Sequence, residues 1–524
     1  MKNVIKFLTT ILATLIISSC FGQTCGSIQT LTTAQQIQLN SLVVQLDTAL
    51  VQENYSSIDS LSSLIKITFG TEGGKPDAVE IYYNLVSTTN WMNLSNAILL
   101  SRQLISADSL VYADLWKVAK GMAPPSYQPH SIYLRASAEV AVGLLKIADK
   151  ESDLTRKALY QSWANRALDS LATMQLPNGA FPFPDLRPYG DPVFSPIIQN
   201  YLNSLGTDSS LVLNEGWIID DSNTGEFKFD AGVIGNAYYE AYTYTGNIQY
   251  KNIALSVANY MMPLKMNINY NYNTFVSLAL TRGYQLSNDT NYLNRAILNL
   301  RYGVYPGQLT KGRWVDGHNA NSRYHNIIIY NIVPTINLIP NSNPYKTDLD
   351  TMTVRAIQNL IDYSNTCGSA TGFRWLTSAY ALDSTLYSTT TRNQIKNLIG
   401  RHINQAAING KYLDVQSMGL YIELLNLFTL GIDIDINLPI NLKTSIFPNP
   451  FTDQVNVVFE LPNEQIISVS LYDNSGKLIS VIDRGHKIKG TYNYSINGSN
   501  LTAGIYFVVL QTTTGKLSSK IIKQ

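Results

Sequence analysis

One short segment, residues 310–325, gathers the densest set of side chains in this chain that could do chemistry. It reads TKGRWVDGHNANSRYH, with two histidines, two arginines, one aspartate and two large aromatic residues. Histidine moves protons near neutral pH, arginine binds a carboxylate through paired hydrogen bonds, and a large aromatic ring stacks on the flat face of a sugar. The candidates for contact with a substrate are Arg313 and Trp314. The candidates for catalysis are Asp316, His318, Arg323, Tyr324 and His325.

Carboxylates allow a second chemistry. Glycoside hydrolysis needs two carboxyl groups, one that donates a proton and one that stays ionised. Asp230 and Asp316 are our candidates for this pair. Elimination from a uronide would instead need a cation that neutralises the substrate's carboxylate and a base that removes a proton. The candidates for elimination are Arg323, Tyr324 and His325.

Structural roles remain open for several of these residues. Asp230 and the adjacent pair Asp220-Asp221 could serve as loop or N-cap residues, because Asp is favoured just before a helix. Trp314 could plug the junction of a helical hairpin, and Arg323 could cap a carbonyl group.

The elements that must position these side chains are helices. Residues 131–149 are apolar on most faces and should form an inner helix, whereas residues 154–174 carry charge on one face and should lie outside it. The same alternation recurs between residues 34 and 430. It predicts six hairpins and a further helix over residues 415–430 that would close a ring. The first helices of the hairpins should begin near Asp77, Ser131, Asp230, Asn273, Arg323 and Thr371.

The outer helices share a local repeat, aromatic-x-Asn-x-Ala, which begins at Trp163, Tyr250 and Tyr292. The last two copies are one helical hairpin apart. Together with the loop QLPNGAFPF at residues 175–183, this organisation resembles the (α/α)6 toroid of six-hairpin glycosidases and of several polysaccharide lyases, over most of residues 70–430. The resemblance implies a mainly α fold and a polysaccharide or other glycan as ligand. An open helical solenoid is the alternative.

In a closed ring the inner helices run parallel, so their N-termini open at one end, which we call the mouth. Free N–H groups and positive dipole ends gather there and suit a hydroxyl-rich or anionic ligand. Three of the four histidines in the helical body should lie at the mouth, and His402 is the exception. Besides Arg313 and Trp314, the residues expected to bind substrate at the mouth are His130, Asn273 and Trp375.

The C-terminal tail has a different pattern. From Val455 onward, short alternating runs bounded by Gly, Asn, Asp or Pro predict a small β-sandwich of about seven strands. Three motifs follow in order, FPNPF at 447–451, LYDNSGK at 471–477 and LTAGIYF at 501–507. Residues 445–524 thereby resemble the type A C-terminal sorting domain of the type IX secretion route of Bacteroidota. The resemblance implies that a secretion machinery binds this tail and carries the protein across the outer membrane. A generic β-sandwich or carbohydrate-binding module is the alternative.

The N-terminus predicts a secretory signal peptide over residues 1–22, with two lysines, an apolar run and then small residues. An α/α toroid-like domain would then span residues 23–431, a linker 432–443 and the β-sandwich 444–524. Residues 17–20 also fit a lipoprotein box, so acylation of Cys20 is an alternative. If Cys20 leaves with the leader, Cys25 and Cys367 remain as an even pair, and we expect a disulfide between them.

Composition excludes some functions. Only 14% of the residues are charged and the formal net charge is +1, so the chain has no electrostatic footprint for nucleic acid. His and Cys do not occur at zinc-site spacing, and we expect neither metal nor cofactor. The sequence predicts a secreted or cell-surface glycoside hydrolase or polysaccharide lyase. A noncatalytic glycan-binding or structural surface protein is the alternative.

Overall fold

The computed structural model describes residues 31–69, 94–107, 133–221, 225–316, 318–319, 322–366, 374–396, 398–399, 415–429 and 444–524, except 462–464, 475–477 and 513–515. The chain divides into two compact units, one containing Leu94–Lys396 and the other containing Phe428–Gln524. The predicted signal peptide and linker lie outside the described residues. So do Cys20, His130 and both cysteines of the predicted disulfide, Cys25 and Cys367.

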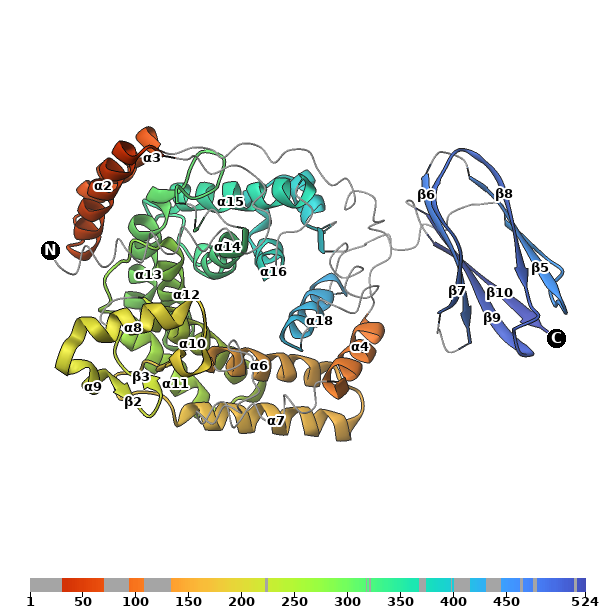
Figure 1. Cartoon of the computed structure of the whole chain (residues 1–524), viewed down its shortest axis with the longest axis horizontal. Coiled ribbons are helices and arrows are strands. Elements are labelled where there is room, and N and C mark those ends of the chain that lie inside the picture. The colour runs from red at the N-terminus through yellow and green to blue at the C-terminus, as the bar shows by residue number, and fades with distance from the viewer. Residues whose placement is uncertain are drawn as a thin grey trace. The chain divides into compact units, whose positions relative to one another are not determined.

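Pairs of helices build the helical unit, with the first helix of a pair nearer the centre, as α14 and α15 show (Figure 1). The pairs are α6 (Leu134–Lys150) with α7 (Leu154–Ala172), α10 (Glu226–Thr245) with α11 (Ile248–Met261), α12 (Tyr270–Ser287) with α13 (Thr290–Gly303), and α14 (Ser322–Ile336) with α15 (Lys346–Thr366). Further inner helices are α16 (Arg374–Ala381) and α18 (Val415–Thr429). The N-terminal helices are α2 (Thr33–Val51), α3 (Tyr55–Phe69) and α4 (Leu94–Ala107).

The inner helices follow one another around the unit. Contacts join α6 to α10, α10 to α12, α12 to α14 and α14 to α16. The predicted starts near Ser131, Asp230, Asn273, Arg323 and Thr371 correspond to Leu134, Glu226, Tyr270, Ser322 and Arg374. The start predicted near Asp77 lies outside the described residues. The helical unit is therefore a mainly α, toroid-like arrangement of hairpins, as predicted.

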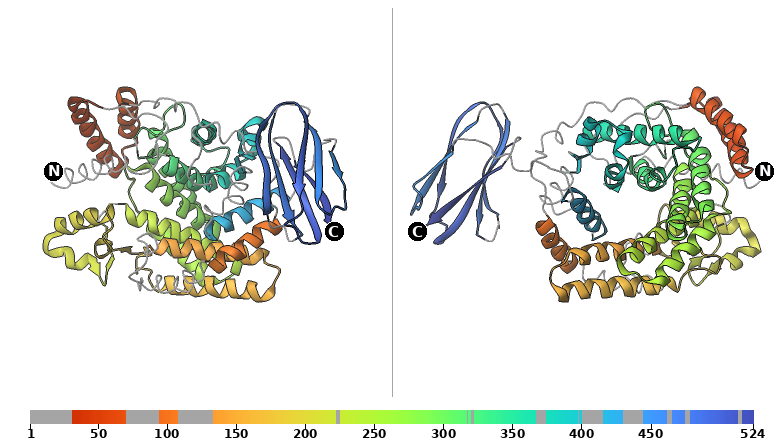
Figure 2. Two further views of the ribbon diagram at one scale, coloured as in Figure 1. Left: turned by 45° about the vertical axis from the view of Figure 1, so that its right-hand side comes forward. Right: turned by 180° about the vertical axis from the view of Figure 1, so that it is seen from behind.

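Two glycines close the ring between α18 and α6. A Cβ atom on Gly143 of α6 would lie 2.8 Å from the Cα atom of Gln416, and one on Gly419 would lie 2.8 Å from the Cα atom of Gly143. The two helix backbones therefore touch at this crossing, which only glycine permits. All views show α18 beside α4 as well (Figures 1 and 2). The series of inner helices thus returns to its first member.

Small residues also set the spacing of α10. A Cβ atom on Gly232 would lie 2.7 Å from Cβ of Phe275 on α12, and one on Gly235 would lie 2.7 Å from Val257 on α11. Close approach on both sides fixes how α10 is rotated, and with it the side chains that α10 presents at its N-terminus.

The aromatic-x-Asn-x-Ala repeat links neighbouring outer helices. The hydroxyl of Tyr250 on α11 donates to Oδ1 of Asp169 on α7 at 2.9 Å, and the hydroxyl of Tyr292 on α13 donates to Oδ1 of Asn259 on α11 at 2.5 Å. The alanines of the repeat are buried. The copies that begin at Tyr250 and Tyr292 therefore each tie one hairpin to the preceding one.

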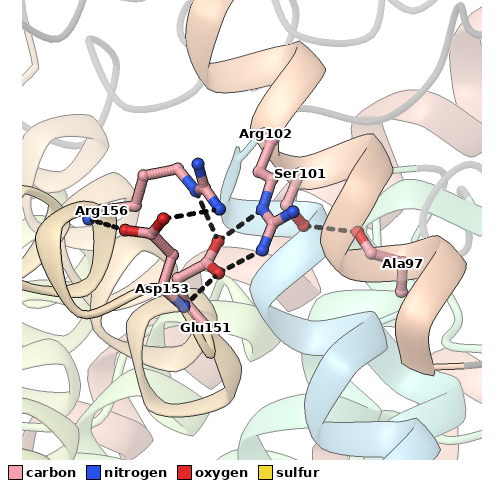
Figure 3. Close-up of polar contacts among 6 residues, drawn as sticks. All are labelled: Ala97, Ser101, Arg102, Glu151, Asp153 and Arg156. Carbon is pink, nitrogen blue, oxygen red and sulfur yellow. Dashed lines mark hydrogen bonds and ion pairs between the residues drawn. The ribbon is translucent and has the colours of Figure 1, made fainter.

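An ion-pair cluster around the buried carboxylate of Glu151 fastens α4 to the turn between α6 and α7 (Figure 3). Arg102 donates through Nε to Oε2 of Glu151 at 2.7 Å and through its second nitrogen to Oε1. The Glu151 carboxylate also accepts from the backbone N–H of Asp153 at 2.9 Å. These hydrogen bonds, led by that of Arg102, lower the pKa of Glu151 to about 2. We call this cluster the α4 clasp.

An insertion separates the α6–α7 and α10–α11 hairpins. It contains β1 (Phe183–Pro184), η3 (Arg187–Tyr189), α8 (Phe194–Leu205), η4 (Gly206–Asp208), α9 (Ser209–Val212), β2 (Leu213–Asn214) and β3 (Trp217–Ile218). The short strands pair in the order β1-β3-β2. Two further 3-10 turns in the unit are η5 (Tyr305–Gly307) and η6 (Ser384–Leu386).

The second unit is a β-sandwich. One sheet has the order β10-β9-β6-β7 and the other the order β4-β5-β8, all antiparallel. Alternate residues of β5 (Val455, Val457, Phe459 and Leu461) pack against Val469 and Leu510 of the facing sheet. The strands are β4 (Thr444–Phe447), β5 (Gln454–Leu461), β6 (Gln465–Asp473), β7 (Leu478–Lys487), β8 (Gly490–Asn497), β9 (Gly504–Thr512) and β10 (Lys516–Lys523). The predicted small sandwich is confirmed.

Within the described residues, no helix has the length and apolar character needed to cross a membrane.

Candidate functional site

The N-terminal ends of α6, α10, α12 and α14 form the mouth and bring polar side chains into mutual contact. At its centre, Arg135 of α6 donates through Nη1 to Oδ2 of Asp230 on α10 at 2.6 Å. The guanidinium carbon of Arg135 also lies 4.0 Å from the ring centroid of Tyr133 and 4.2 Å from that of Phe229. Arg135 is therefore held between two rings while it pairs with Asp230.

Asp230 is fully buried at this position. Burial raises the pKa of Asp230 to about 6, against the opposing effect of Arg135. The second carboxyl oxygen, Oδ1, has no hydrogen-bond partner among the described residues. A buried acceptor without a partner is costly, so this atom has an unused capacity to accept a hydrogen bond.

Glu226 lies one helical turn before Asp230, so the two carboxyl groups share a face of α10, about 5–6 Å apart at their Cβ atoms. The hydroxyl of Tyr272 on α12 donates to Oε1 of Glu226 at 2.6 Å. Burial raises the pKa of Glu226 to about 7, Asp230 and Asp221 act in the same direction, and the Tyr272 hydrogen bond and Arg135 oppose them. The side chain is nevertheless only partly buried. Glu226 can therefore hold a proton near neutral pH and remain in reach of a ligand.

The residue before Glu226 makes room for Tyr272. Gly225 has φ +95°, and a Cβ atom there would lie 2.1 Å from the Tyr272 ring. Glycine is thus required both by the backbone conformation and by the ring that lies against it. The N-terminus of α10 and the Tyr272 ring are consequently fitted to each other.

His318 and Tyr324 form a stacked pair beside this group. Their ring centroids are 3.8 Å apart at an interplanar angle of 28°. The side-chain nitrogen of Asn271 lies 3.3 Å from Nε2 of His318, and an amide nitrogen can only donate, so Nε2 accepts. Burial lowers the pKa of His318, although Asp316 opposes this effect. His318 is therefore neutral near pH 7, and its ring offers a flat surface together with Tyr324.

Deeper in the ring, ion pairs satisfy the carboxylates. Nζ of Lys146 lies 2.7 Å from Glu240 and 2.9 Å from Glu423. Burial would raise the pKa of Glu240, but Lys146 and Arg282 lower it overall, so Glu240 is ionised. Among the described carboxyl groups on the inner helices, Glu226 and Asp230 are the ones whose pKa is raised.

The structure places three predicted site residues in the packing of the helices. Asn273 is buried and donates to the carbonyls of Asn267 and Gly303, both at 2.7 Å. Trp314 is 1% exposed and donates from Nε1 to the carbonyl of Val304 at 3.0 Å. Trp375 is fully buried at the start of α16. Burial of this kind favours the structural alternative for all three.

The contacts of His325 and Asp316 described below are with residues other than Glu226 and Asp230. The His325 ring is 1% exposed and packs edge-on against Trp314 with centroids 5.1 Å apart. Burial, helped by Arg313 nearby, lowers the pKa of His325 to about 3. Asp316 accepts from the backbone and side-chain nitrogens of Asn319 at 2.9 to 3.2 Å, which shapes the loop before α14. Arg323 is exposed next to Tyr324.

Sequence reasoning left out Arg135, Tyr272 and Glu226 as site residues, although Glu226 is the first residue of α10 and follows the acidic residues Asp220 and Asp221 closely. The first two lie inside helices and have no local motif. An i, i+4 pair of carboxyl residues at a predicted inner-helix start was the signal that could have identified Glu226.

A separate cavity of about 650 Å³ lies on the insertion, lined by Arg187, Gln199, Leu202, Asn203, Gly206, Ser209, Ser210 and Leu213. Its lining contains no carboxyl group, so it offers no acid for the chemistry considered above. In the described part of the chain, no group of three or more His, Cys, Asp or Glu residues is arranged to hold a metal ion.

Residues 445–524 match the family model of the secretion system C-terminal sorting domain. The tail is a secretion sorting domain. The protein is accordingly exported, to the cell surface or beyond it, and the predicted resemblance of this domain is confirmed. The match lends no support to the lipoprotein alternative at Cys20.

The comparisons over the whole chain gave weaker similarity. No curated protein matches the chain in sequence. A crystal structure of a GH127 β-L-arabinofuranosidase from Geobacillus stearothermophilus T6 is similar over 81% of this chain and 85% of its own, with 10% identity and a TM-score of 0.33. A score this low carries no argument about activity. The fold described above rests on the helix contacts of this protein.

Proposed function

We propose that this exported protein is an enzyme that acts on extracellular polysaccharide, with the Glu226–Asp230 pair as its catalytic centre. The supporting observation is a partly open carboxyl group with a pKa of about 7, one turn from a buried carboxylate that is held by Arg135. Glycoside hydrolysis requires two carboxyl groups whose environments give them different pKa values, so that one is protonated while the other is ionised.

In the hydrolytic reaction, protonated Glu226 gives its proton to the glycosidic oxygen as the bond between this oxygen and the anomeric carbon breaks. Ionised Asp230 takes a proton from water as the water oxygen bonds to the anomeric carbon. Tyr272 orients the Glu226 carboxyl group, and Arg135 keeps Asp230 ionised and in place. The rings of His318 and Tyr324 provide a surface on which a sugar can stack.

Turnover by the purified full-length protein tests the proposal. The protein is incubated with a panel of plant, algal and host polysaccharides, and new reducing ends are measured together with the ultraviolet absorbance of unsaturated uronates. Glu226→Gln should lower turnover at least about 100-fold, because it removes the proton donor. Glu215→Gln, a change of the same kind at an exposed position, should leave turnover unchanged.

Glycan binding without turnover by the folded wild type would instead support the noncatalytic alternative. Unsaturated uronates among the products would replace hydrolysis with elimination.

A further inference from the structure

Three cations in the first turns of inner helices are already committed to partners within the protein. Arg135 pairs with Asp230 at 2.6 Å, and Arg374 at the start of α16 pairs with Glu139 of α6. Lys228 on α10 donates from Nζ to the backbone carbonyl of Lys265 at 2.7 Å. A carboxylate on a substrate would have to break one of these contacts to gain a cation.

Arg135 is the cation that contacts the proposed catalytic pair, and its geometry makes this exchange unfavourable. The rings of Tyr133 and Phe229 lie against its guanidinium group at 4.0 and 4.2 Å, and Asp230 occupies one edge. A uronate at this position would compete with Asp230 for Arg135 and would also lie in the field of Asp221, which acts on both Glu226 and Asp230. Like charges repel in a partly buried site.

The bases needed for elimination from a uronide are also poorly provided. Burial and Glu226 raise the pKa of the Tyr272 hydroxyl well above its ordinary value, and this hydroxyl donates its hydrogen to Glu226. Burial likewise raises the pKa of Tyr324. Nε2 of His318 already accepts from Asn271. These groups are suited to donate hydrogen bonds or to stack on a ring.

The remaining features suit hydroxyl groups and sugar rings. Oδ1 of Asp230 is a fully buried acceptor without a described partner. The stacked rings of His318 and Tyr324 offer an uncharged flat surface. A buried acceptor without a partner and an uncharged aromatic surface at the same mouth suit a neutral sugar.

Building on the proposed function, we infer that the mouth selects an uncharged glycan and rejects a uronate, because the Arg135–Asp230 pair consumes the positive charge that a uronate would need. The enzyme is then a glycoside hydrolase rather than a polysaccharide lyase. Arg323, exposed beside Tyr324, is the residue that would hold the carboxylate if this inference were wrong.

Matched pairs of oligosaccharides test the inference. Each pair has the same sugar, linkage and length and differs only at C6, for example galacto- and galacturono-oligosaccharides or manno- and mannurono-oligosaccharides. Binding to the full-length protein is measured by calorimetry, and turnover is measured on the same samples. We expect the uncharged member of the recognised pair to bind at least about tenfold more tightly.

The outcomes separate the two proposals. Preferred binding of the uncharged member without turnover would support the inference and overturn the catalytic proposal. Tighter binding of the uronate, or formation of unsaturated products, would overturn the inference, and turnover would then still support an enzyme. If no member of any pair binds, both proposals fail.

A variant that removes the acidic partner of Arg135 gives a second test, with a result that a purely structural role of Asp230 would not produce. Asp230→Asn frees Arg135, so affinity for the uronate member should rise about tenfold while affinity for the uncharged member falls. Glu215→Gln should change neither affinity. Unchanged uronate affinity in folded Asp230→Asn protein, checked by its thermal unfolding, would show that Asp230 does not set the selection. If Asp230→Asn does not fold, the wild-type comparison of matched pairs decides alone.

Discussion

The hydroxyl of Tyr272 donates to Oε1 of Glu226 at 2.6 Å across the junction of α12 and α10. This hydrogen bond favours the ionised form of Glu226 and partly offsets the burial that raises its pKa to about 7. Tyr272 therefore adjusts the pH at which the proposed proton donor loses its proton.

Tyr272→Phe should raise the pKa of Glu226 above its value in the wild type, because the hydrogen bond that stabilises the carboxylate is gone. The alkaline limb of the pH–rate profile should move to higher pH, and turnover should fall by about tenfold through looser positioning of the acid. The control is Tyr292→Phe, which removes a hydroxyl from an outer helix. If the pH–rate profile of Tyr272→Phe coincided with that of the wild type, Tyr272 would not influence the pKa of Glu226.

The wild-type pH profile should be bell-shaped, with its maximum between pH values of about 6 and about 7. Below this range Asp230 becomes protonated and loses its role as base, and above it Glu226 is ionised and loses its role as acid. Initial rates on the best polysaccharide substrate, measured in buffers of constant ionic strength, test this expectation. A flat profile from pH 5 to 9 would contradict the assignment of both groups.

The α4 clasp should contribute to stability in a pH-dependent way. Arg102 and the other donors lower the pKa of Glu151 to about 2 from an ordinary value of 4.5. A depressed folded-state pKa means that the contribution is complete above about pH 4.5 and is lost as the pH falls toward 2. Glu151→Gln should therefore cost about 2 kcal/mol at pH 7 and much less in acid, measured by urea unfolding.

Glu215→Gln provides the matched control for the clasp, since its side chain is exposed. Equal destabilisation of Glu151→Gln at pH 7 and pH 3 would show that the charge of Glu151 does not support the clasp.

The crossing of α6 and α18 should not tolerate a side chain. Gly143→Ala would place a Cβ atom 2.8 Å from backbone atoms of Val415 and Gln416, so the helices must separate. We expect a loss of about 2 kcal/mol in unfolding free energy. Gly490→Ala in β8 has open space around the new atom and serves as control. Thermal unfolding of a Gly143→Ala protein that matches the wild type would mean that the ring can open there without cost.

The inner helices could be predicted from the sequence because their apolar faces follow the helical period over many residues. The start of α14, predicted near Arg323, lies at Ser322, and the start of α12, predicted near Asn273, lies at Tyr270. The tail was equally readable, since its alternation has a period of two and its turns carry Gly and Asn. Long periodic patterns average out local exceptions.

The site was harder to predict because residue type alone does not reveal orientation. Trp314 looked like a sugar platform, yet its indole N–H is used by the carbonyl of Val304. Arg135 looked like an ordinary helix residue, yet it meets Asp230. The contact between Arg135 and Asp230 depends on how α10 is rotated about its axis. The contact of Gly232 with Phe275 sets this rotation. Such long-range packing leaves no mark in a short stretch of sequence.

The contact between Gly143 and Gly419 joins the earliest described inner helix to the latest one. Because a polypeptide is synthesised from its N-terminus, α6 cannot pack against α18 until almost the whole helical unit has been made. The domain can therefore reach its final compact state only late in its synthesis.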